Sequence, residues 1–222
     1  MQQVDGGGYF GMQQAAGNQA IFISPNGYES SDDYDTPVSG NGFWDENGQD
    51  VEFVAAIVDW AKQNLCVDTG RIFSIGHSFG GMLSDNIGCK LTSSFRAIAP
   101  ASSSFRRVYV DLNTDCTGEP IAAMVTHGTN DNFVLFEEGV EARDYFLGVN
   151  GCSSDSTPTT PSGCVSFTGL SECCDRSLLK GVVGRSCCST RLRTPNFAPD
   201  GPRRPAPPGA GAGRRRCGRR RA

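Results

Sequence analysis

The sequence predicts an α/β fold in which a mostly parallel sheet is covered by helices on both faces. Short apolar runs of the length expected for buried strands alternate with segments whose apolar residues recur at helical spacing. The chain has 222 residues, 38% of them hydrophobic, which suits one well-buried domain with a tail. It contains no run of about 18 apolar residues, so we expect no membrane-spanning segment and no membrane partner.

The first two predicted elements are a strand and a long helix. The run "AIFISP", residues 20–25, predicts a buried strand that ends in a Pro-Asn-Gly turn. An acidic loop follows, and its aromatic residues could line a binding site or pack within the loop: Tyr28, Tyr34, Phe43 and Trp44. Residues 50–65 predict the clearest helix, with Asp50 as its N-cap and apolar positions on one face: Val54, Ile57, Val58, Ala61 and Leu65.

The middle of the chain continues the alternation of strands and helices. "RIFSIG", "AIAPAS" and "IAAMVTHG" predict strands over residues 71–76, 97–102 and 121–128. A helical face formed by Met82, Leu83 and Ile87 follows the first of these strands, and a helix is predicted over residues 136–147. Residues 150–174 are rich in Ser, Thr, Pro, Gly and Cys, which predicts a loop region pinned by disulfides.

The charges divide the chain into two parts. Residues 1–175 carry 7 basic and 23 acidic side chains, whereas residues 176–222 carry 13 and 1. We therefore predict two parts, an acidic folded body over 1–175 and a disordered Arg/Gly/Pro/Ala-rich tail over 176–222. The acidic body is not expected to bind nucleic acid, but the basic tail could bind a polyanion.

The composition of the tail allows two interpretations. Of the last 25 residues, 23 are Gly, Pro, Ala or Arg, and such a segment buries too little apolar surface to fold. It could be a basic arm that binds nucleic acid. It could also be a GC-rich gene translated out of frame, which the abrupt change in charge and the loss of pattern favour.

The ten cysteines indicate a disulfide-bonded, secreted protein. Zinc binding is the alternative, but the chain has only two histidines and no C-x-x-C pair, so we expect no metal. Cys89 and Cys116 are our preferred pair, although spacing alone does not fix connectivity. The first residues lack the features of a secretory signal.

The segment "GHSFG", residues 76–80, matches G-x-S-x-G between a predicted strand and a predicted helix. That order is required for a nucleophile elbow, in which Ser78 is exposed at a tight turn and the Phe79 N–H faces a developing oxyanion. A structural Gly-rich turn is the alternative.

Asp131, in "THGTND" just past a predicted strand, is the candidate acid that would orient an imidazolium. An Asp in an ordinary Asn-Asp-Asn turn is the alternative. The expected order places the histidine after the acid, yet no histidine follows His127.

Residues 6–175 resemble the secreted feruloyl esterases and related polyhydroxybutyrate-depolymerase-like carbohydrate esterases of the α/β-hydrolase fold. The resemblance rests on four segments: "YFGMQQAAGNQAIFISPNG", "GQDVEFVAAIVDWAKQNLCVDTGRIFSIGHSFGGM", "FRAIAPASSS" and "VTHGTNDNFVLFEEGVEARDYFLGVNGC". It implies that the body over 1–175 is a partial hydrolase domain, with Ser78 as nucleophile, Asp131 as triad acid, Phe79 as a backbone oxyanion donor, secretion, disulfides and no cofactor. The implied substrates are feruloyl groups esterified to plant cell-wall arabinoxylan, or small phenolic esters.

The resemblance also implies parts that this sequence lacks. The family's first sheet strand and the His-Gly loop that supplies a second oxyanion donor would lie upstream of Met1. The catalytic histidine would lie where the basic tail stands, and neither His77 nor His127 is expected to replace it. We therefore expect an N-terminally truncated and catalytically impaired serine esterase. The alternatives are an acetylxylan or polyhydroxyalkanoate esterase, and a degenerate hydrolase body with a polyanion-binding tail.

Overall fold

The centre of the molecule is a parallel sheet of three strands. The computed structural model describes residues 9, 11–17, 19–29, 41–45, 47–105, 111–112, 114–159 and 164–169. The sheet order is β3-β4-β5, with strands Phe73–His77, Ala97–Ala101 and Ala122–Ala123. His77 pairs with Ala101 at the carboxyl end of β3, and a further bridge joins Ala101 to Thr126 beyond β5.

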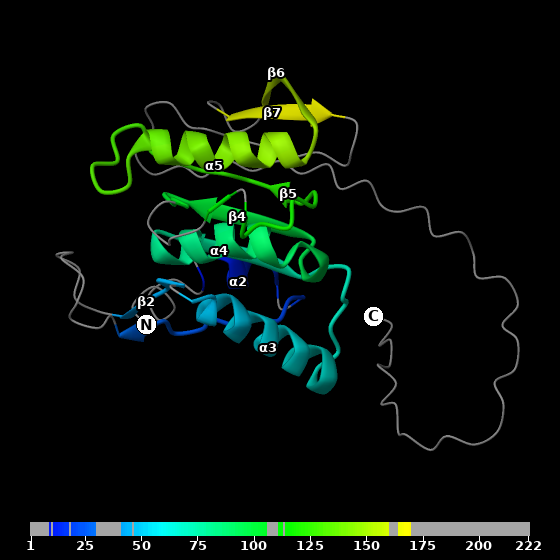
Figure 1. Ribbon diagram of the computed structural model, residues 1–222. Helices are drawn as coiled ribbons and strands as arrows, with labels where there is room; N and C mark the ends of the chain where they lie inside the picture. Colours follow the sequence, from blue (N-terminus) through cyan, green and yellow to red (C-terminus); the bar gives the residue numbers. More distant parts are fainter. Residues whose placement is uncertain are drawn as a thin grey trace, which may run out of the picture. The chain divides into compact units, whose positions relative to one another are not determined.

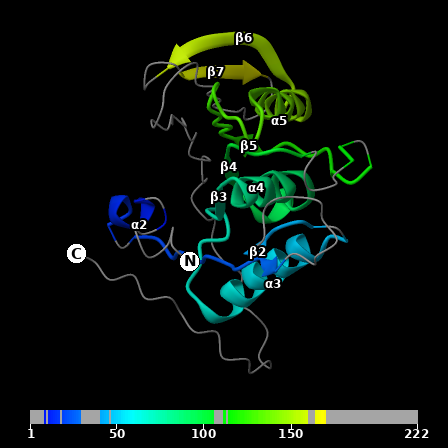
Figure 2. The same ribbon diagram turned by 90° about the vertical axis from the view of Figure 1, so that its left-hand side faces the viewer.

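Helices lie on both sides of this sheet. Figure 2 shows α3, α4 and α5 on one side and the short α2 on the other; their bounds are Gln49–Asn64, Phe79–Lys90, Phe136–Val149 and Met12–Ala15. No residue of α2 is buried, so the long helices bury most of the core. The parallel sheet with these helices confirms the predicted α/β class.

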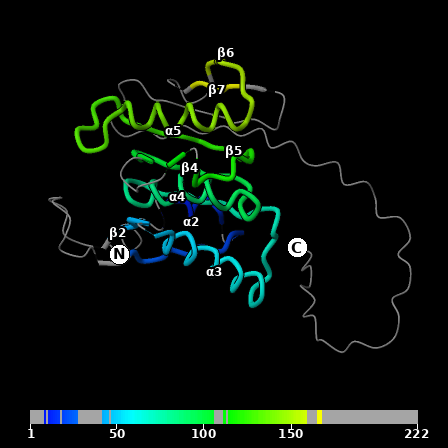
Figure 3. The backbone as a smooth tube through the Cα atoms, viewed as in Figure 1, coloured from blue at the N-terminus to red at the C-terminus, as the bar shows by residue number. Residues whose placement is uncertain are grey.

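Two small antiparallel pairs flank the main sheet (Figure 1). Strand β1, Tyr28–Glu29, pairs with β2, Asn41–Gly42. Strand β6, Cys152–Thr159, pairs with β7, Cys164–Gly169, beyond the end of α5. The path in Figure 3 runs from α3 through β3, α4 and β4, and then through β5 and α5.

The core lies where α3, α4 and α5 pack on the sheet. Its buried members come from all of these elements and include Val54, Val58, Leu83, Ile87, Ile98, Ala123, Val125, Ala142 and Phe146. Gly88 allows α4 to approach closely, because a Cβ there would meet the side chains of Ile98 and Phe146. Alternation along β3 turns Ser74 toward α4, where its hydroxyl lies 2.8 Å from that of Ser84.

The structure confirms the predicted strands at β3 and β4 and the helices α3, α4 and α5. Strand β5 is shorter than its predicted span, because regular pairing covers only Ala122–Ala123 and resumes at Thr126 as a single bridge.

Three local predictions were wrong. Residues 20–25 form no strand, and Ile21 and Ile23 are exposed, because among the described residues no neighbouring strand pairs with this run. The predicted loop over 150–174 contains the β6–β7 hairpin. Asp50 is not the N-cap of α3, because Gly48 takes that position with φ 80°.

The preferred cysteine pair is confirmed: Cys89 and Cys116 form a disulfide that joins the end of α4 to the segment before β5. Cys66 is disulfide-bonded as well. Within the described part of the chain, no helix is both long and apolar enough to cross a membrane. The predicted tail over 176–222 lies outside the described residues.

Candidate active site

Ser78 occupies a sharp turn between β3 and α4. Its backbone has φ 55° and ψ −122°, a conformation that is strained for a residue with a side chain. The Ser78 N–H donates to the Ala101 carbonyl (3.0 Å), and the Ser78 carbonyl accepts the first helical bond from Met82 (2.9 Å). Phe79 is the first residue of α4, so its N–H has no acceptor within the helix. This is the geometry that an exposed serine nucleophile requires.

Glycines on either side of Ser78 make this turn possible. A Cβ on Gly76 would overlap the backbone of Gly80, so a side chain at residue 76 would push α4 away from β3. A Cβ on Gly81 would lie 2.7 Å from the Ala101 oxygen and 2.9 Å from the Ser103 Cβ. Glycine is therefore a packing requirement at both positions.

Asp131 lies at the same edge of the sheet as Ser78. Ser78 follows β3, Ser102 follows β4, and Asp131 lies a few residues past the bridge at Thr126, so all three follow the carboxyl ends of parallel strands. The ends of β3 and β5 are two strand spacings apart, about 10 Å. Side chains and an imidazole ring can bridge such a gap, and this edge is where ligands bind in open parallel sheets.

The Asp131 carboxylate is fixed by backbone donors. Its Oδ1 accepts the N–H groups of Phe133 (2.9 Å) and Val134 (3.0 Å). Burial alone would raise the pKa of Asp131, but these two donors, with the Ser102 hydroxyl and the electrostatic effect of the nearby His127, hold the pKa below its ordinary value. Asp131 is therefore ionised at neutral pH, as the acid partner of an imidazolium must be.

Apolar contacts join the nucleophile side of the site to the acid side. Val134, which follows Asp131 by three residues, packs against Met82 of α4 and the side chain of Phe79. The Phe79 ring meets Trp44 on another side, edge to face, with ring centroids 4.6 Å apart. Trp44, one of the aromatic residues considered from the sequence, therefore packs beside the elbow.

A buried carboxylate anchors the segment that carries Trp44. Asp45 Oδ1 accepts the N–H groups of Asp50 (3.0 Å) and Val51 (3.1 Å), so Asp45 supplies the helix cap that was predicted at Asp50. Asp45 Oδ2 pairs with Lys90 (3.0 Å) and accepts from Asn86 (3.1 Å), both on α4. The role of Asp45 was not predicted from the sequence. Its position just before the predicted helix could have indicated a capping role. Its contacts with α4 could not be predicted in this way, because they involve residues 41 to 45 positions away.

Both histidines of the chain are in the described part, and neither forms a hydrogen bond with Ser78 there. His77 is the exposed last residue of β3, and strand alternation places it on the sheet face opposite α4. His127 is 1% exposed, and its Nε2 lies 2.8 Å from the Val134 carbonyl oxygen.

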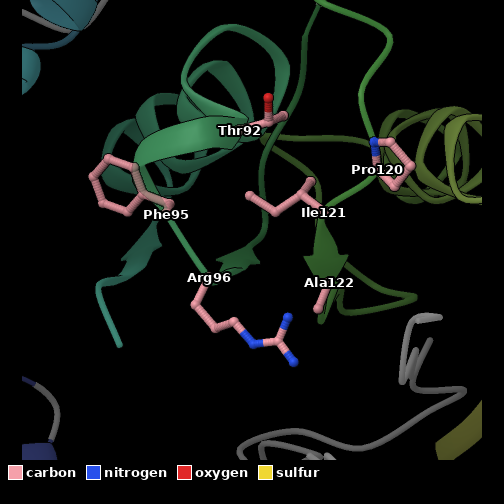
Figure 4. Close-up of a pocket in the computed structure, with 6 residues that line it drawn as sticks. All are labelled: Thr92, Phe95, Arg96, Pro120, Ile121 and Ala122. Carbon is pink, nitrogen blue, oxygen red and sulfur yellow. The ribbon is translucent and has the colours of Figure 1, made fainter. Parts of the chain in front are cut away.

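The described cavity lies at the opposite edge of the sheet. It encloses about 220 Å³ near the amino ends of β4 and β5, and its lining residues are Thr92, Phe95, Arg96, Pro120, Ile121 and Ala122. In Figure 4 the Ile121 side chain points toward Thr92 and Phe95, while the Arg96 side chain extends away from them. This cavity is separate from the candidate site. Among the described residues, no group of three or more His, Cys, Asp or Glu side chains could hold a metal ion.

The parallel sheet, the strained serine between β3 and α4, and the carboxylate at the same sheet edge define an α/β-hydrolase fold. The solved acetyl xylan esterase from Aspergillus awamori supports this fold, with a TM-score of 0.55 at 16% identity over 66% of this chain and 69% of that chain. No family model matches the chain.

Comparison with curated proteins identifies the relatives. The chain is 34% identical over 155 residues to the probable feruloyl esterase C of Aspergillus niger, covering 70% of this chain and 52% of that protein. It is 31% identical to feruloyl esterase C of Emericella nidulans, covering 74% and 56%. The chain thus spans about half the length of these relatives. The chain has an α/β-hydrolase fold and is similar in sequence to feruloyl esterases over about 70% of its length.

Proposed function

We propose that this chain carries the nucleophile and the acid of a feruloyl-esterase-type serine hydrolase, which releases ferulate from plant cell-wall arabinoxylan. The observation that carries the proposal is the strained Ser78 turn, with φ 55°, at the sheet edge that also holds the fixed Asp131 carboxylate. The feruloyl esterase relatives support the substrate class.

The proposed reaction is a two-step acyl transfer. Ser78 Oγ attacks the ester carbonyl while a histidine takes its proton, and the Phe79 N–H stabilises the tetrahedral oxyanion. The oxyanion collapses, the sugar alcohol leaves with the proton from the imidazolium, and an acyl enzyme remains. Water then attacks the acyl enzyme in the same manner and releases the carboxylic acid. Asp131 stabilises the imidazolium in both steps.

We propose that this chain is impaired because it lacks the histidine. Its only two histidines are His77 and His127, and neither lies where it could accept the proton from Ser78. Loss of the base in a serine hydrolase lowers kcat by roughly 10⁶-fold.

Imidazole rescue tests the proposed site in the chain as it exists. Hydrolysis of methyl ferulate is measured with increasing free imidazole, which can replace a missing base, and Ser78→Ala measures the reaction of imidazole alone. We expect rescue above that background, and loss of the excess rate in Asp131→Asn. An equal rate in wild type and Ser78→Ala at every imidazole concentration would refute the assignment of the nucleophile.

Substrate choice separates this proposal from its closest alternative. The same rescue assay with acetylated xylan and a short polyhydroxybutyrate ester tests for an acetylxylan or polyhydroxyalkanoate esterase. Ferulate release that exceeds both reactions supports the feruloyl-esterase proposal, whereas preference for either other ester replaces it.

We propose secretion as the location of the natural protein. The Cys89–Cys116 disulfide and the total of ten cysteines support an oxidising compartment. Mass spectrometry of the secreted fraction, with cysteine alkylation before and after reduction, tests this proposal.

A polyanion-binding protein is the second candidate, and the charge of residues 176–222 favours it: 13 basic and 1 acidic side chains. It predicts salt-sensitive binding to heparin or DNA that is lost on removal of residues 176–222. No binding at low salt would eliminate this candidate.

A further inference from the structure

His127 is a buried imidazole with a hydrogen-bonding role outside the proposed reaction. Its Nε2 lies 2.8 Å from the Val134 carbonyl oxygen. A carbonyl oxygen only accepts, so Nε2 must carry the hydrogen. The ring packs against Gly139 of α5, where a Cβ would collide with Nδ1. Nδ1 is buried and has no hydrogen-bond partner among the described residues, so the contacts of the ring place its hydrogen on Nε2.

The acceptor of this hydrogen bond connects His127 to the candidate acid. Val134 gives its carbonyl to His127, and its own N–H donates to Asp131 Oδ1 at 3.0 Å. His127 Nε2 itself lies 3.8 Å from Asp131 Oδ2, which is too far for a hydrogen bond. The hydrogen-bonded link from His127 to Asp131 therefore runs through the backbone N–H and carbonyl of Val134.

We propose that His127 is a positioning residue, which holds the backbone of Val134 so that the acid segment, residues 128–134, presents Asp131 in a single orientation. The proposal rests on the proposed function in taking Asp131 as the acid. Gly139 belongs to the same device, because only a residue without a Cβ leaves room for the ring.

The tautomer of His127 in the full chain is the first test. Long-range ¹H–¹⁵N spectra distinguish Nε2–H, Nδ1–H and imidazolium forms, and a His127→Gln sample assigns the signals. We expect a hydrogen on Nε2. An Nδ1–H tautomer would overturn the proposal, because Nε2 could then not donate to the Val134 carbonyl.

Two substitutions separate the hydrogen bond from simple packing. His127→Gln keeps an N–H donor that can reach the Val134 carbonyl, whereas His127→Leu fills similar space without a donor. The readout is the pKa of the Asp131 carboxyl, measured by ¹³C titration and assigned with Asp131→Asn. We expect His127→Leu to raise this pKa by about 1 or more, because the Phe133 and Val134 donors loosen, and His127→Gln to keep it low.

The controls make each outcome decisive. Far-ultraviolet circular dichroism establishes that each variant is folded. A folded His127→Leu variant with an unchanged Asp131 pKa refutes the proposal. Where His127→Leu does not fold, a folded His127→Gln variant with a raised Asp131 pKa refutes it.

These measurements require no hydrolysis, so a failure of the esterase proposal would be seen separately, in the imidazole rescue. Ser78→Ala should leave both the tautomer and the Asp131 pKa unchanged.

Discussion

Asp85 should make the stability of this protein fall as the pH rises from acidic to neutral. It lies on α4 with 0% exposure, and neither carboxyl oxygen has a hydrogen-bond partner of good geometry among the described residues. Burial raises its pKa to about 7, and the nearby Ser103 hydroxyl offsets this only in part. The folded state therefore holds a proton on Asp85 over a pH range in which the unfolded chain has lost it.

The sign and size of the effect follow from linkage. The ordinary Asp pKa is 3.8 and the folded value is about 7, so the stabilisation is fully present below about pH 4 and is lost up to about pH 7. A difference of about 3 in pKa corresponds to about 4 kcal/mol in the free energy of unfolding. The uncharged Asp85→Asn variant should lack this dependence. Its free energy of unfolding, compared with that of the wild type, should therefore be more favourable at pH 8 than at pH 4.

Urea unfolding followed by tryptophan fluorescence between pH 4 and pH 8 measures this effect. The difference between the wild-type and Asp85→Asn profiles isolates Asp85, because the other carboxylates contribute to both. Asp59→Asn is the matched control, since Asp59 lies on α3 with its side chain 69% exposed, and its profile should parallel the wild type. Parallel profiles for wild type and Asp85→Asn would refute the reasoning.

Three further predictions concern the turn at Ser78 and the disulfide. Ser78→Gly should raise the free energy of unfolding by about 1 kcal/mol in urea titrations, because glycine tolerates φ 55°. Ser78→Ala keeps the strain, so equal free energies of unfolding for the two variants would contradict this prediction. Gly76→Ala should lower the free energy of unfolding by about 3 kcal/mol, whereas Gly80→Ala should lower it far less, because a Cβ on Gly80 would meet nothing within 4 Å. Similar melting temperatures for the two variants would contradict the close approach of Gly76 to the Gly80 backbone. Joint replacement of Cys89 and Cys116 by Ala should lower the free energy of unfolding by about 3 to 4 kcal/mol, because the disulfide closes a loop with a sequence separation of 27. Equal stability of the wild type with and without reductant would contradict this prediction.

The sequence predicted those parts of the fold that depend on local pattern. The strands β3 and β4 were predicted from their apolar runs, and the helix α4 from its helical spacing of apolar residues. The glycine-rich turn between β3 and α4 is itself a recognisable motif. Ser78 and Asp131 were assigned by motif and chain order, and the structure places them at one sheet edge, as parallel pairing requires. Their catalytic roles stay predictions.

Features that depend on distant partners were not predicted. The β6–β7 hairpin is rich in Ser and Thr and largely exposed, so its pairing leaves little apolar pattern to detect. Residues 20–25 have the composition of a buried strand, yet burial requires a neighbour that the sequence of the run does not specify. The contacts of Asp45 with α4 likewise arise only when the chain has folded.

The position of Val134 has a consequence for how substitutions combine. Val134 meets His127 through its carbonyl and Asp131 through its N–H, while its side chain touches Met82 and Phe79. Changes at Met82 and at His127 should therefore show a coupling energy in a double-mutant cycle, of about 0.5 kcal/mol or more, through their shared neighbour. Substitutions near Ser78, as at Met82, and near Asp131, as at His127, would then accumulate together in evolution, with one tolerated only when the other is present.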